Sequence, residues 1–230
     1  MAEEKRPGKI VVISGFSGVG KGTVVKELLK NFDHYALSVS MTTRQPREGE
    51  EHGVNYYFVT NEEFEKMIRE EGFLEHAGYV DHYYGSPKAF VMENIAEGRD
   101  VILEIEVQGA MQIKKEHPEA VLVFVTTPSA AEMARRLIGR KTENHEQILG
   151  RFRRAVEEAE DMKNYDFIVI NDKLEDCVEE LNRIIEKNEG GVKYDPGFKN
   201  EFVRDLREII KKHIEEAGSR AAGIIADKKQ

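Results

Sequence analysis

The sequence predicts an α/β protein with three layers, α/β/α, around a central parallel sheet, and a small mixed insert. Short apolar runs rich in β-branched residues alternate with segments of helical spacing along most of the chain, as in βαβ units. One stretch, Gln45–Gly85, breaks this alternation and is rich in Tyr, Gly and His. The 230 residues, 40% of them hydrophobic, suffice for one core with an elaboration.

The expected elements follow one another along the chain. The strands are short buried runs, which we expect at Lys9–Ser14, Asp100–Val107, Ala120–Val125 and Phe167–Ile170. Helical spacing or capping residues predict helices over Lys21–Asn31, Glu62–Glu71 after a cap at Thr60 or Asn61, Pro128 to about Ile138, about His145 to Lys163, and Leu174–Lys187. Strands joined by helices imply a parallel sheet covered on both faces.

The C-terminal part of the chain predicts a linker followed by an amphipathic helix. Glu189–Gly197 contains three glycines and a proline. The apolar residues beyond it fall on one helical stripe, which consists of Phe198, Phe202, Leu206, Ile209, Ile210 and Ile214. We expect this helix to dock on the protein's own core, and the sequence leaves open that it forms a homo-oligomer contact instead.

Composition and charge exclude several classes of protein. The 34 Lys and Arg against 43 Asp and Glu give a net charge of −9, which disfavours nucleic acid as a partner. Cys177 is the one cysteine, so an internal disulfide and a cysteine zinc cluster are excluded. Met1–Lys9 has no apolar signal-peptide core, and no apolar run approaches the ~20 residues that span a bilayer. We therefore expect a cytoplasmic protein without a membrane partner.

The segment Gly15–Thr23, with the sequence GFSGVGKGT, follows the first strand and opens the first helix. Glycines let backbone N–H groups approach phosphates closely, and the helix N-terminus adds a favourable dipole. This context predicts a phosphate-binding P-loop rather than a plain glycine turn, with Lys21 at the β and γ phosphates. The candidate nucleotide ligands are Gly15, Ser17, Gly18, Val19, Gly20, Lys21, Gly22 and Thr23. Gly22 stands where the commonest pattern has a hydroxyl ligand for Mg²⁺, so the metal ligands stay undetermined.

A second candidate phosphate site lies in Ser38–Glu50, which has the sequence SVSMTTRQPREGE. Arg44 and Arg47 flank Gln45–Pro46, where the proline keeps the backbone out of a helix. Two guanidinium groups on a short turn offer planar donor pairs that suit one phosphate. The alternative for such a pair alone is a solvated basic loop, which the glycine and aromatic residues that follow disfavour.

These blocks closely resemble guanylate kinase. The family pattern SVSxTTRxPRxGExxGxxYxF matches SVSMTTRQPREGEEHGVNYYF in this chain. FLEHAGYVDHYYGS, from Phe73 to Ser86, resembles FLEWAxxxGNYYGT, and LEIEVQGA, from Leu103 to Ala110, resembles LEIDVQGA. The GKGT loop, the segment Arg136–Arg151 and the VIND that follows also agree. The resemblance covers about residues 8 to 188.

The resemblance implies a P-loop three-layer α/β/α fold with a central parallel sheet, a small mixed α/β GMP-binding insert and a helical lid. Residues 1–188 would form the guanylate kinase-like domain, with a core of 8–37, 87–134 and 166–188, an insert of 38–86 and a lid of 135–165. Residues 189–230 would add the linker and the C-terminal amphipathic helix. The implied activity is phosphorylation of GMP, and of dGMP, by ATP with Mg²⁺ through in-line transfer.

The resemblance also assigns the GMP site. Glu75 matches the carboxylate that accepts from the adjacent N1–H and N2–H₂ of guanine, whereas adenine would leave it unpaired, at a cost of orders of magnitude in discrimination. Glu106 matches a family aspartate on the guanine side, and it would share one face of a strand with Glu104. The remaining matched residues are Arg44, Arg47, Tyr56 and Tyr84 at the GMP phosphate, and Ser40 and Ser86 near the base.

On the ATP side, three arginines match the family's lid and would close over the phosphates: Arg136, Arg140 and Arg151. Asn171 matches a loop near the adenine. Catalytic roles fall to Lys21, Arg44, Arg140 and Arg151, whereas Arg135, Arg153 and Arg154 indicate an ordinary charged helix face. Further departures from the family pattern are Phe16, where proline is usual, His82, where asparagine is common, and Lys141, where glycine is usual.

Two alternatives stay open at this point. A guanylate-kinase-like module that binds proteins and has lost catalysis would typically lack an intact P-loop, and this chain keeps Gly15, Gly20, Lys21 and Thr23. A P-loop kinase with a different acceptor is disfavoured by Glu75 and the paired arginines.

Overall fold

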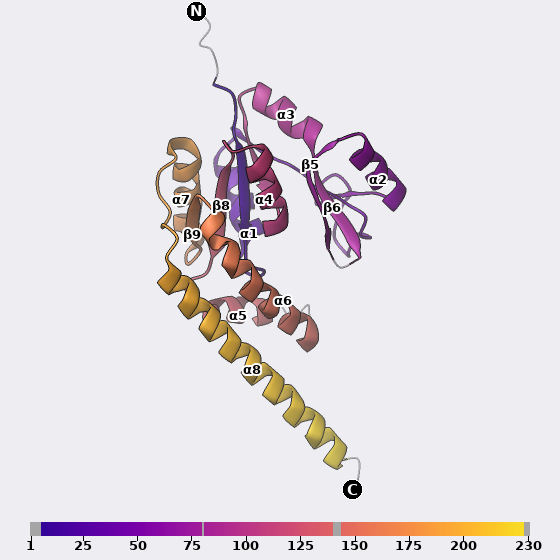
Figure 1. Cartoon of the computed structure of the whole chain (residues 1–230), viewed down its shortest axis with the longest axis vertical. Coiled ribbons are helices and arrows are strands. Elements are labelled where there is room, and N and C mark those ends of the chain that lie inside the picture. The colour runs from indigo at the N-terminus through magenta and orange to yellow at the C-terminus, as the bar shows by residue number, and fades with distance from the viewer. Residues whose placement is uncertain (1–5, 80, 140–143, 228–230) are drawn as a thin grey trace, which may run out of the picture.

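A computed structural model of the chain describes residues 6–79, 81–139 and 144–227, with side chains for all of these except Tyr79 and residues 216–227. Five parallel strands form the main sheet in the order β2-β7-β1-β8-β9 (Figure 1). Their bounds are β1 Ile10–Gly15, β2 Tyr35–Leu37, β7 Asp100–Glu104, β8 Val121–Thr126 and β9 Phe167–Ile170. The predicted α/β fold with a central parallel sheet is confirmed.

Helices cover both faces of this sheet. Those that contact the sheet are α1 Lys21–Asn31, α3 Lys88–Ala96, α4 Val107–Glu116 and α7 Leu174–Lys187. The helices α5 Ala130–Gly139 and α6 His145–Glu158, with a 3₁₀ turn, η1 Ala159–Asn164, after α6, pack mainly against each other and the C-terminal helix. The crossover through α1 leads from β1 toward the β2 edge of the sheet, and the crossover through α4 leads from β7 toward the β9 edge. Because such crossovers are right-handed, α1 and α4 lie on opposite faces. All residues of β1 and β8 are buried between these layers.

A second sheet of four strands forms a separate lobe beside the main sheet (Figure 1). Its order is β4-β3-β6-β5, and the strands are β3 Met41–Thr42, β4 Tyr57–Phe58, β5 Phe73–Tyr79 and β6 His82–Pro87. β3 pairs parallel with β4 and antiparallel with β6, so the insert is mixed, as predicted. Its helix α2, Asn61–Arg69, begins at the predicted cap, where Thr60 and Glu63 accept from each other's backbone N–H groups.

The C-terminal helix α8, Pro196–Asp227, runs along α5 and α6 and extends past them (Figure 1). The linker before it attaches to the sheet edge, where Val192 and Ile168 exchange two backbone hydrogen bonds of 2.8 and 3.2 Å. Phe202, Val203 and Leu206 are buried, which confirms the expected docking on the protein's own core.

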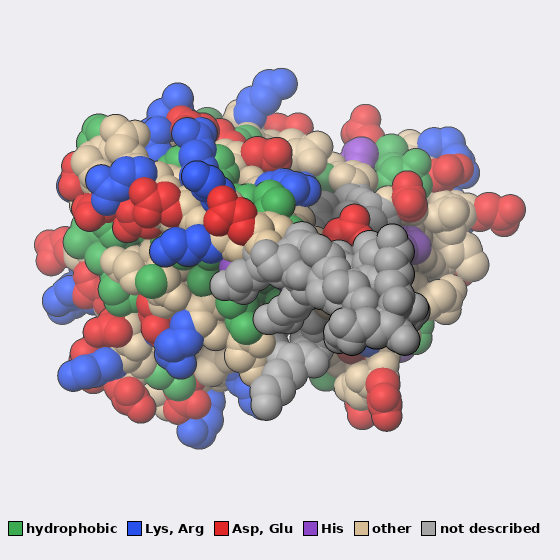
Figure 2. Space-filling view, turned by 90° about the horizontal axis from the view of Figure 1, so that it is seen from below, with side chains coloured by type: hydrophobic (Ala, Val, Ile, Leu, Met, Phe, Trp, Pro, Cys, Tyr) green, Lys and Arg blue, Asp and Glu red, His purple; other side chains and the backbone are tan. Residues whose placement is uncertain are grey.

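The surface mixes charges of both signs. Figure 2 shows Lys and Arg side chains interspersed with Asp and Glu over the visible face, with hydrophobic side chains only in small groups. This pattern accords with a chain in which 33% of residues are charged. Within the part of the chain that the structure describes, no helix combines the length and the apolar character needed to cross a membrane.

Candidate active site

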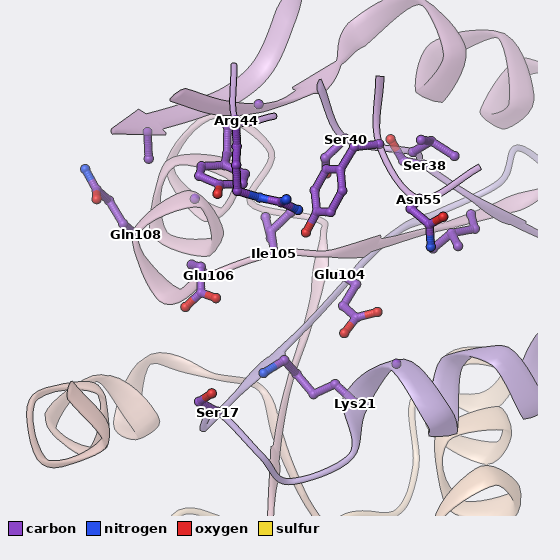
Figure 3. Close-up of a pocket in the computed structure, with 18 of the residues that line it drawn as sticks. Ser17, Lys21, Ser38, Ser40, Arg44, Asn55, Glu104, Ile105, Glu106 and Gln108 are labelled. Carbon is purple, nitrogen blue, oxygen red and sulfur yellow. The ribbon is translucent and has the colours of Figure 1, made fainter. Parts of the chain in front are cut away.

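A cavity of about 890 Å³ opens between the main sheet and the insert. It lies at the carboxyl ends of the neighbouring strands β1 and β7. From these two strands the chain crosses toward opposite edges of the sheet, and parallel sheets bind ligands at such points. In Figure 3, Lys21 and Ser17 approach the cavity from the loop after β1, whereas Arg44 and Ser40 approach it from the insert. The cavity therefore joins the two candidate phosphate sites.

The loop after β1 curves around the space on its side of the cavity. Its glycines have positive φ angles of 87° at Gly18 and 92° at Gly20, which other residues rarely adopt. Since α1 begins directly at Lys21, the unpaired N–H groups of its first turn lie at the loop. Lys21 Nζ donates to the carbonyl oxygens of Gly15 at 2.6 Å and Phe16 at 3.2 Å, which holds the ammonium group against the loop.

On the insert, Glu50 fixes the orientation of Arg44. The Arg44 guanidinium donates two hydrogen bonds of 2.9 Å to the two Glu50 oxygens, and it lies 5.5 Å from the centre of the Tyr56 ring. The hydrogen-bonded pair raises the pKa of Arg44 and lowers the pKa of Glu50, each chiefly through the other. Glu50 also accepts from the Arg47 backbone N–H at 2.8 Å. One carboxylate therefore fixes the turn that carries both arginines.

Glu75 is buried at the wall of the cavity. The pairing of β5 with β6 shifts register between Phe73 and Glu75, and such an irregularity re-aims a side chain. The Ser86 hydroxyl, across the strand pair, donates to Glu75 Oε1 at 2.7 Å. Burial raises the pKa of Glu75 to about 7, against the opposing effect of Ser86. The side chain is thus a preorganised acceptor that changes charge near neutral pH.

The first turn of α4 leaves room for the Glu75 carboxyl group. A Cβ atom at Gly109 would stand 2.9 Å from Glu75 Cδ and closer still to Oε2, inside any ordinary contact distance. Gly109 has a negative, helical φ angle, so the reason for glycine here is space and not backbone conformation. The sequence assigns no role to Gly109, because the close approach joins two segments far apart in the chain.

Glu104 and Glu106 do not share one face of a strand, so that prediction is wrong. β7 ends at Glu104, and Glu106 is the N-cap of α4. The predicted strand was too long because the apolar alternation continues past the end of β7 to Val107, which is buried in the first turn of α4. Both carboxylates still line the cavity. The cavity walls displace water and raise the pKa of Glu104, whereas Lys21 lowers it.

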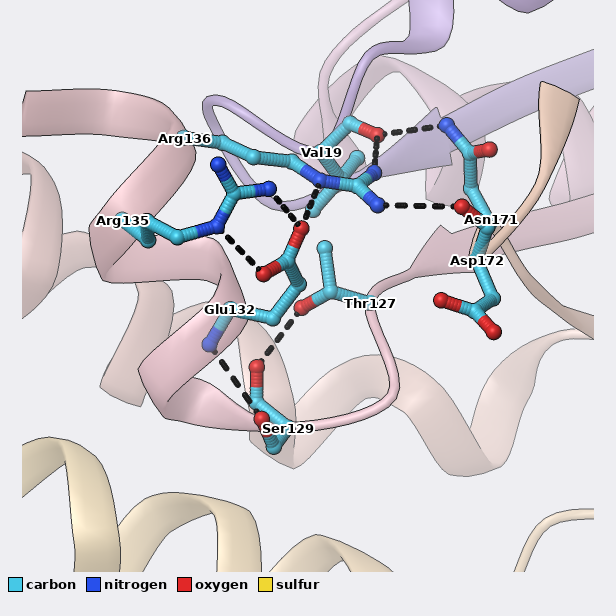
Figure 4. Close-up of polar contacts among 8 residues, drawn as sticks. All are labelled: Val19, Thr127, Ser129, Glu132, Arg135, Arg136, Asn171 and Asp172. Atoms are coloured by element: carbon cyan, nitrogen blue, oxygen red, sulfur yellow. Dashed lines mark hydrogen bonds and ion pairs between the residues drawn. The ribbon is translucent and has the colours of Figure 1, made fainter. Parts of the chain in front are cut away.

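Arg136 and Asn171 brace the phosphate-binding loop (Figure 4). The Asn171 amide donates to the Val19 carbonyl oxygen at 2.8 Å, and Arg136 donates to the same oxygen at 3.3 Å. Arg136 also donates to Glu132 at 2.6 Å and to the Asp172 carbonyl oxygen at 3.3 Å. Neither residue is among those that line the cavity. These two predicted nucleotide ligands therefore contact the loop itself.

Helix α6 contributes two arginines to the cavity wall. Arg151, predicted from the sequence, donates to the Ser17 hydroxyl of the loop. Arg154, expected on an ordinary charged face, also lines the cavity and donates to Glu158 Oε1 at 3.2 Å. Glu158 is buried, and its burial raises its pKa. Arg154 is thus anchored from the protein interior and aimed at the cavity.

Comparison with known proteins agrees with this geometry. A sequence profile described as guanylate kinase matches residues 7–188. The chain belongs to the guanylate kinase family. It is 48% identical over 181 residues to a guanylate kinase of Caldanaerobacter subterraneus, which covers 79% of this chain and 88% of the relative. A Clostridioides difficile guanylate kinase is 45% identical over 205 residues, 89% of this chain and 98% of the relative.

A comparison with solved structures also identifies a guanylate kinase as similar to this chain. The crystal structure of guanylate kinase from Anaplasma phagocytophilum has a TM-score of 0.66 and 30% sequence identity, over 80% of this chain and 87% of the other. The guanylate kinase fold, with its parallel five-stranded sheet and separate mixed sheet, is therefore shared by a protein of known structure.

Most residues that the guanylate kinase resemblance assigns meet at this cavity. Those that line it are Ser17, Gly18, Gly20, Lys21, Gly22, Thr23, Ser40, Arg44, Arg47, Tyr56, Glu75, Tyr84, Glu106 and Arg151. Ser86 lies buried beside Glu75, and Gly15 and Val19 belong to the loop without lining the cavity. Arg140 and Lys141 lie outside the described residues.

Proposed function

We propose that this chain transfers the γ-phosphoryl group of ATP to GMP, and to dGMP, with ADP and GDP or dGDP as products. One arrangement carries the proposal: a phosphate-binding loop with Lys21, an arginine held by Glu50, and the buried acceptor Glu75 surround a single cavity. Membership of the guanylate kinase family supports the same reaction.

In this proposal Glu75 selects guanine. An ionised carboxylate accepts from both N1–H and N2–H₂, which are adjacent donors on guanine. Adenine would bring an acceptor to this position and leave a buried carboxylate unpaired, and an unsatisfied buried polar group costs about 1–3 kcal/mol or more when charged. Ser86 and the space at Gly109 hold the carboxyl in place for this contact.

The transfer itself needs positioning and charge neutralisation, without a protein nucleophile. A GMP phosphate oxygen attacks the γ-phosphorus in line, and the electrons of the breaking P–O bond go to the β-phosphate oxygen of ADP. Lys21 and Arg151 would neutralise charge on the transferring group. The GMP phosphate would be held by Arg44, Arg47, Tyr56 and Tyr84.

We assign the core to residues 8–37, 87–134 and 166–188, the GMP-binding insert to 38–86 and the lid to 135–165. Closure of the insert and the lid would exclude water and prevent hydrolysis of ATP. Arg140 retains its role at the phosphates on the strength of the family resemblance. Arg136 and Asn171 would act on ATP through the loop that they brace. The cytoplasmic location and a homo-oligomer through α8 stay predictions from the sequence.

Magnesium fits this site as an ion held mainly by the substrate. Mg²⁺ keeps several waters and uses one or two carboxylates together with substrate phosphates. The described residues contain no group of three or more His, Cys, Asp or Glu side chains suited to a metal, so ATP and water would supply most ligands. Both Glu104 oxygens lie 3.6 Å from the place of a Cβ atom at Gly22, so the Glu104 carboxylate is a candidate ligand beside the loop, and Thr23 lines the same cavity. Bound there, Mg²⁺ would neutralise and orient the β and γ phosphates.

The direct test is GDP formation from ATP, Mg²⁺ and GMP, followed by ion-exchange chromatography. Wild-type protein is expected to form ADP and GDP in equal amounts. Lys21→Ala is expected to lose at least about 10²–10³-fold in turnover, since a positioned donor to a developing charge is worth this much. Lys30→Ala, on the same helix with its side chain 71% exposed, serves as the matched control. Folded wild-type protein that makes no GDP would contradict the proposal.

A further inference from the structure

The C-terminal helix touches the phosphate-binding loop, although it lies beyond the segment that the family profile matches. That segment ends at residue 188, and α8 begins at Pro196. The buried side of α8 packs against α5, α6 and η1. One of its buried residues, Phe202, also contacts the loop between β1 and α1. Helix α8 therefore makes a buried contact with the loop on the ATP side of the cavity.

The contact is made by Phe16, the first residue after β1. Its side chain is fully buried between two rings. The Phe202 ring stacks on it, with centroids 4.8 Å apart and planes 15° apart, and Phe124 of β8 meets it edge-on at 4.9 Å and 81°. Both geometries are favourable for aromatic pairs. The main sheet therefore supports one side of Phe16, and α8 supports the other.

Phe16 connects directly to the groups that would hold phosphate. Its carbonyl oxygen accepts from Lys21 Nζ at 3.2 Å, and the next residue, Ser17, accepts from Arg151 of α6. The loop holds an anion only while its successive N–H groups point inward together. A shift of the Phe16 ring would rotate the adjoining peptide groups and move Lys21 with them.

Farther along, α8 also fastens the helix that carries Arg151. The His213 ring stacks on His145, the first residue of α6, at 5.5 Å and 13°, and it meets Phe152 edge-on at 5.7 Å. In addition, Lys199 pairs with Glu160 of η1 at 3.0 Å. The same helix thus contacts the loop through Phe202 and the lid helix through His213, so it fixes the two relative to each other.

We propose that α8 is a working part of the ATP site and that Phe202 is a positioning residue, which sets the phosphate-binding loop through Phe16. This inference rests on the proposed function and adds to it a segment and a residue outside the matched family region. It predicts that changes at Phe202 alter ATP binding more than GMP binding, even though Phe202 does not line the cavity.

A double-mutant cycle tests the proposal, with Phe16→Leu, Phe202→Leu and the variant that combines them. Leucine keeps a bulky apolar side chain in each place and removes the stacked ring. The dissociation constant for MgATP, measured by calorimetry without GMP, is expected to rise about five-fold in Phe202→Leu, as the loss of one aromatic pair implies, and at least as much in Phe16→Leu, which loses two. The combined variant is expected to weaken binding no further than Phe16→Leu alone, because that change already removes the Phe16–Phe202 stack as well as the edge-on contact with Phe124. The KM for GMP is expected to stay within about two-fold in all three, since the stacked rings lie on the ATP side.

Phe64→Leu is the matched control. Phe64 is also fully buried and stacks on Phe73 at 4.5 Å and 26°, but it lies in the insert. Phe64→Leu is expected to leave the dissociation constant for MgATP unchanged. Thermal unfolding of each variant establishes that the variant is folded. Unchanged MgATP binding in Phe202→Leu, strictly additive effects in the cycle, or equal effects in Phe64→Leu would overturn the inference. Wild-type protein that forms no GDP would instead overturn the proposed function.

Discussion

Replacement of Gly109 by alanine is expected to weaken GMP binding and leave ATP binding intact. The new Cβ atom would stand 2.9 Å from Glu75 Cδ and 3.3 Å from Cγ, with Oε2 nearer than either. Gly109 belongs to the backbone of α4, whereas the Glu75 carboxyl is the end of a side chain. We therefore expect the carboxyl group to move, and its hydrogen bond from Ser86 to be lost or lengthened.

The size of the effect on the KM for GMP follows from the hydrogen bonds that the Glu75 carboxyl group would accept from guanine. Displacement removes at least one of two hydrogen bonds from guanine, and a hydrogen bond to a charged group is worth about 1.5–3 kcal/mol. The KM for GMP is then expected to rise about 10- to 150-fold, at 1.36 kcal/mol for each factor of ten. The folded state changes less, because alanine gains about 1 kcal/mol of helix propensity. Strain of about 1–3 kcal/mol opposes that gain, so the net loss stays below about 2 kcal/mol.

Gly150→Ala provides the control for this substitution. Gly150 also lies inside a helix, α6, but a Cβ atom there would meet nothing within 4 Å. We expect a gain in stability of about 0.5–1 kcal/mol and an unchanged KM for GMP. The assays are steady-state kinetics with GMP varied at saturating ATP, and urea unfolding. If folded Gly109→Ala keeps a KM for GMP within two-fold of wild type, the assigned role of Glu75 is refuted.

Three further outcomes are expected from steady-state kinetics. Because the pKa of Glu75 is raised to about 7 and only its ionised form accepts both guanine donors, kcat/KM for GMP falls as the pH drops below 7. In Glu75→Gln this fall with pH disappears, whereas the pH dependence due to the GMP phosphate, which has a pKa of about 6, remains. Glu50→Gln keeps one acceptor for Arg44 and is expected to raise the KM for GMP about five- to ten-fold, with the KM for ATP unchanged. Arg154→Gln is expected to raise the KM for ATP about three- to ten-fold, whereas Arg153→Gln, at an exposed position, has no such effect.

The sequence predicted the parts of the fold that depend on local pattern. Buried apolar runs located four of the five strands of the main sheet, and capping chemistry placed the N-cap of α2 at Thr60. The three-residue strand β2 and the helices α3 and α4 were not predicted. The boundary between β7 and α4 failed, because Val107 is buried in a helix as it would be in a strand. Periodicity cannot separate the two when the apolar alternation crosses an element boundary.

The site was predictable where the ligands lie close together in the chain. The phosphate-binding loop has its glycines and Lys21 within one short segment, and both paired arginines lie on one turn. The contacts that the sequence missed join distant segments: Gly109 makes room for Glu75, and Phe202 stacks on Phe16. Such pairs are fixed by packing in three dimensions, which a single sequence does not express.

The central claim is the choice of acceptor, and one assay tests it directly. ADP release would be coupled to an optical signal, with ATP and Mg²⁺ and, in turn, GMP, AMP, CMP, UMP or dTMP. We expect rapid turnover with GMP and rates at least about 10³-fold lower with the other four, because a buried carboxylate rejects bases that leave it unpaired. Faster turnover with another acceptor would contradict the assignment of Glu75, and no turnover with any acceptor in folded protein would contradict the assignment of the reaction.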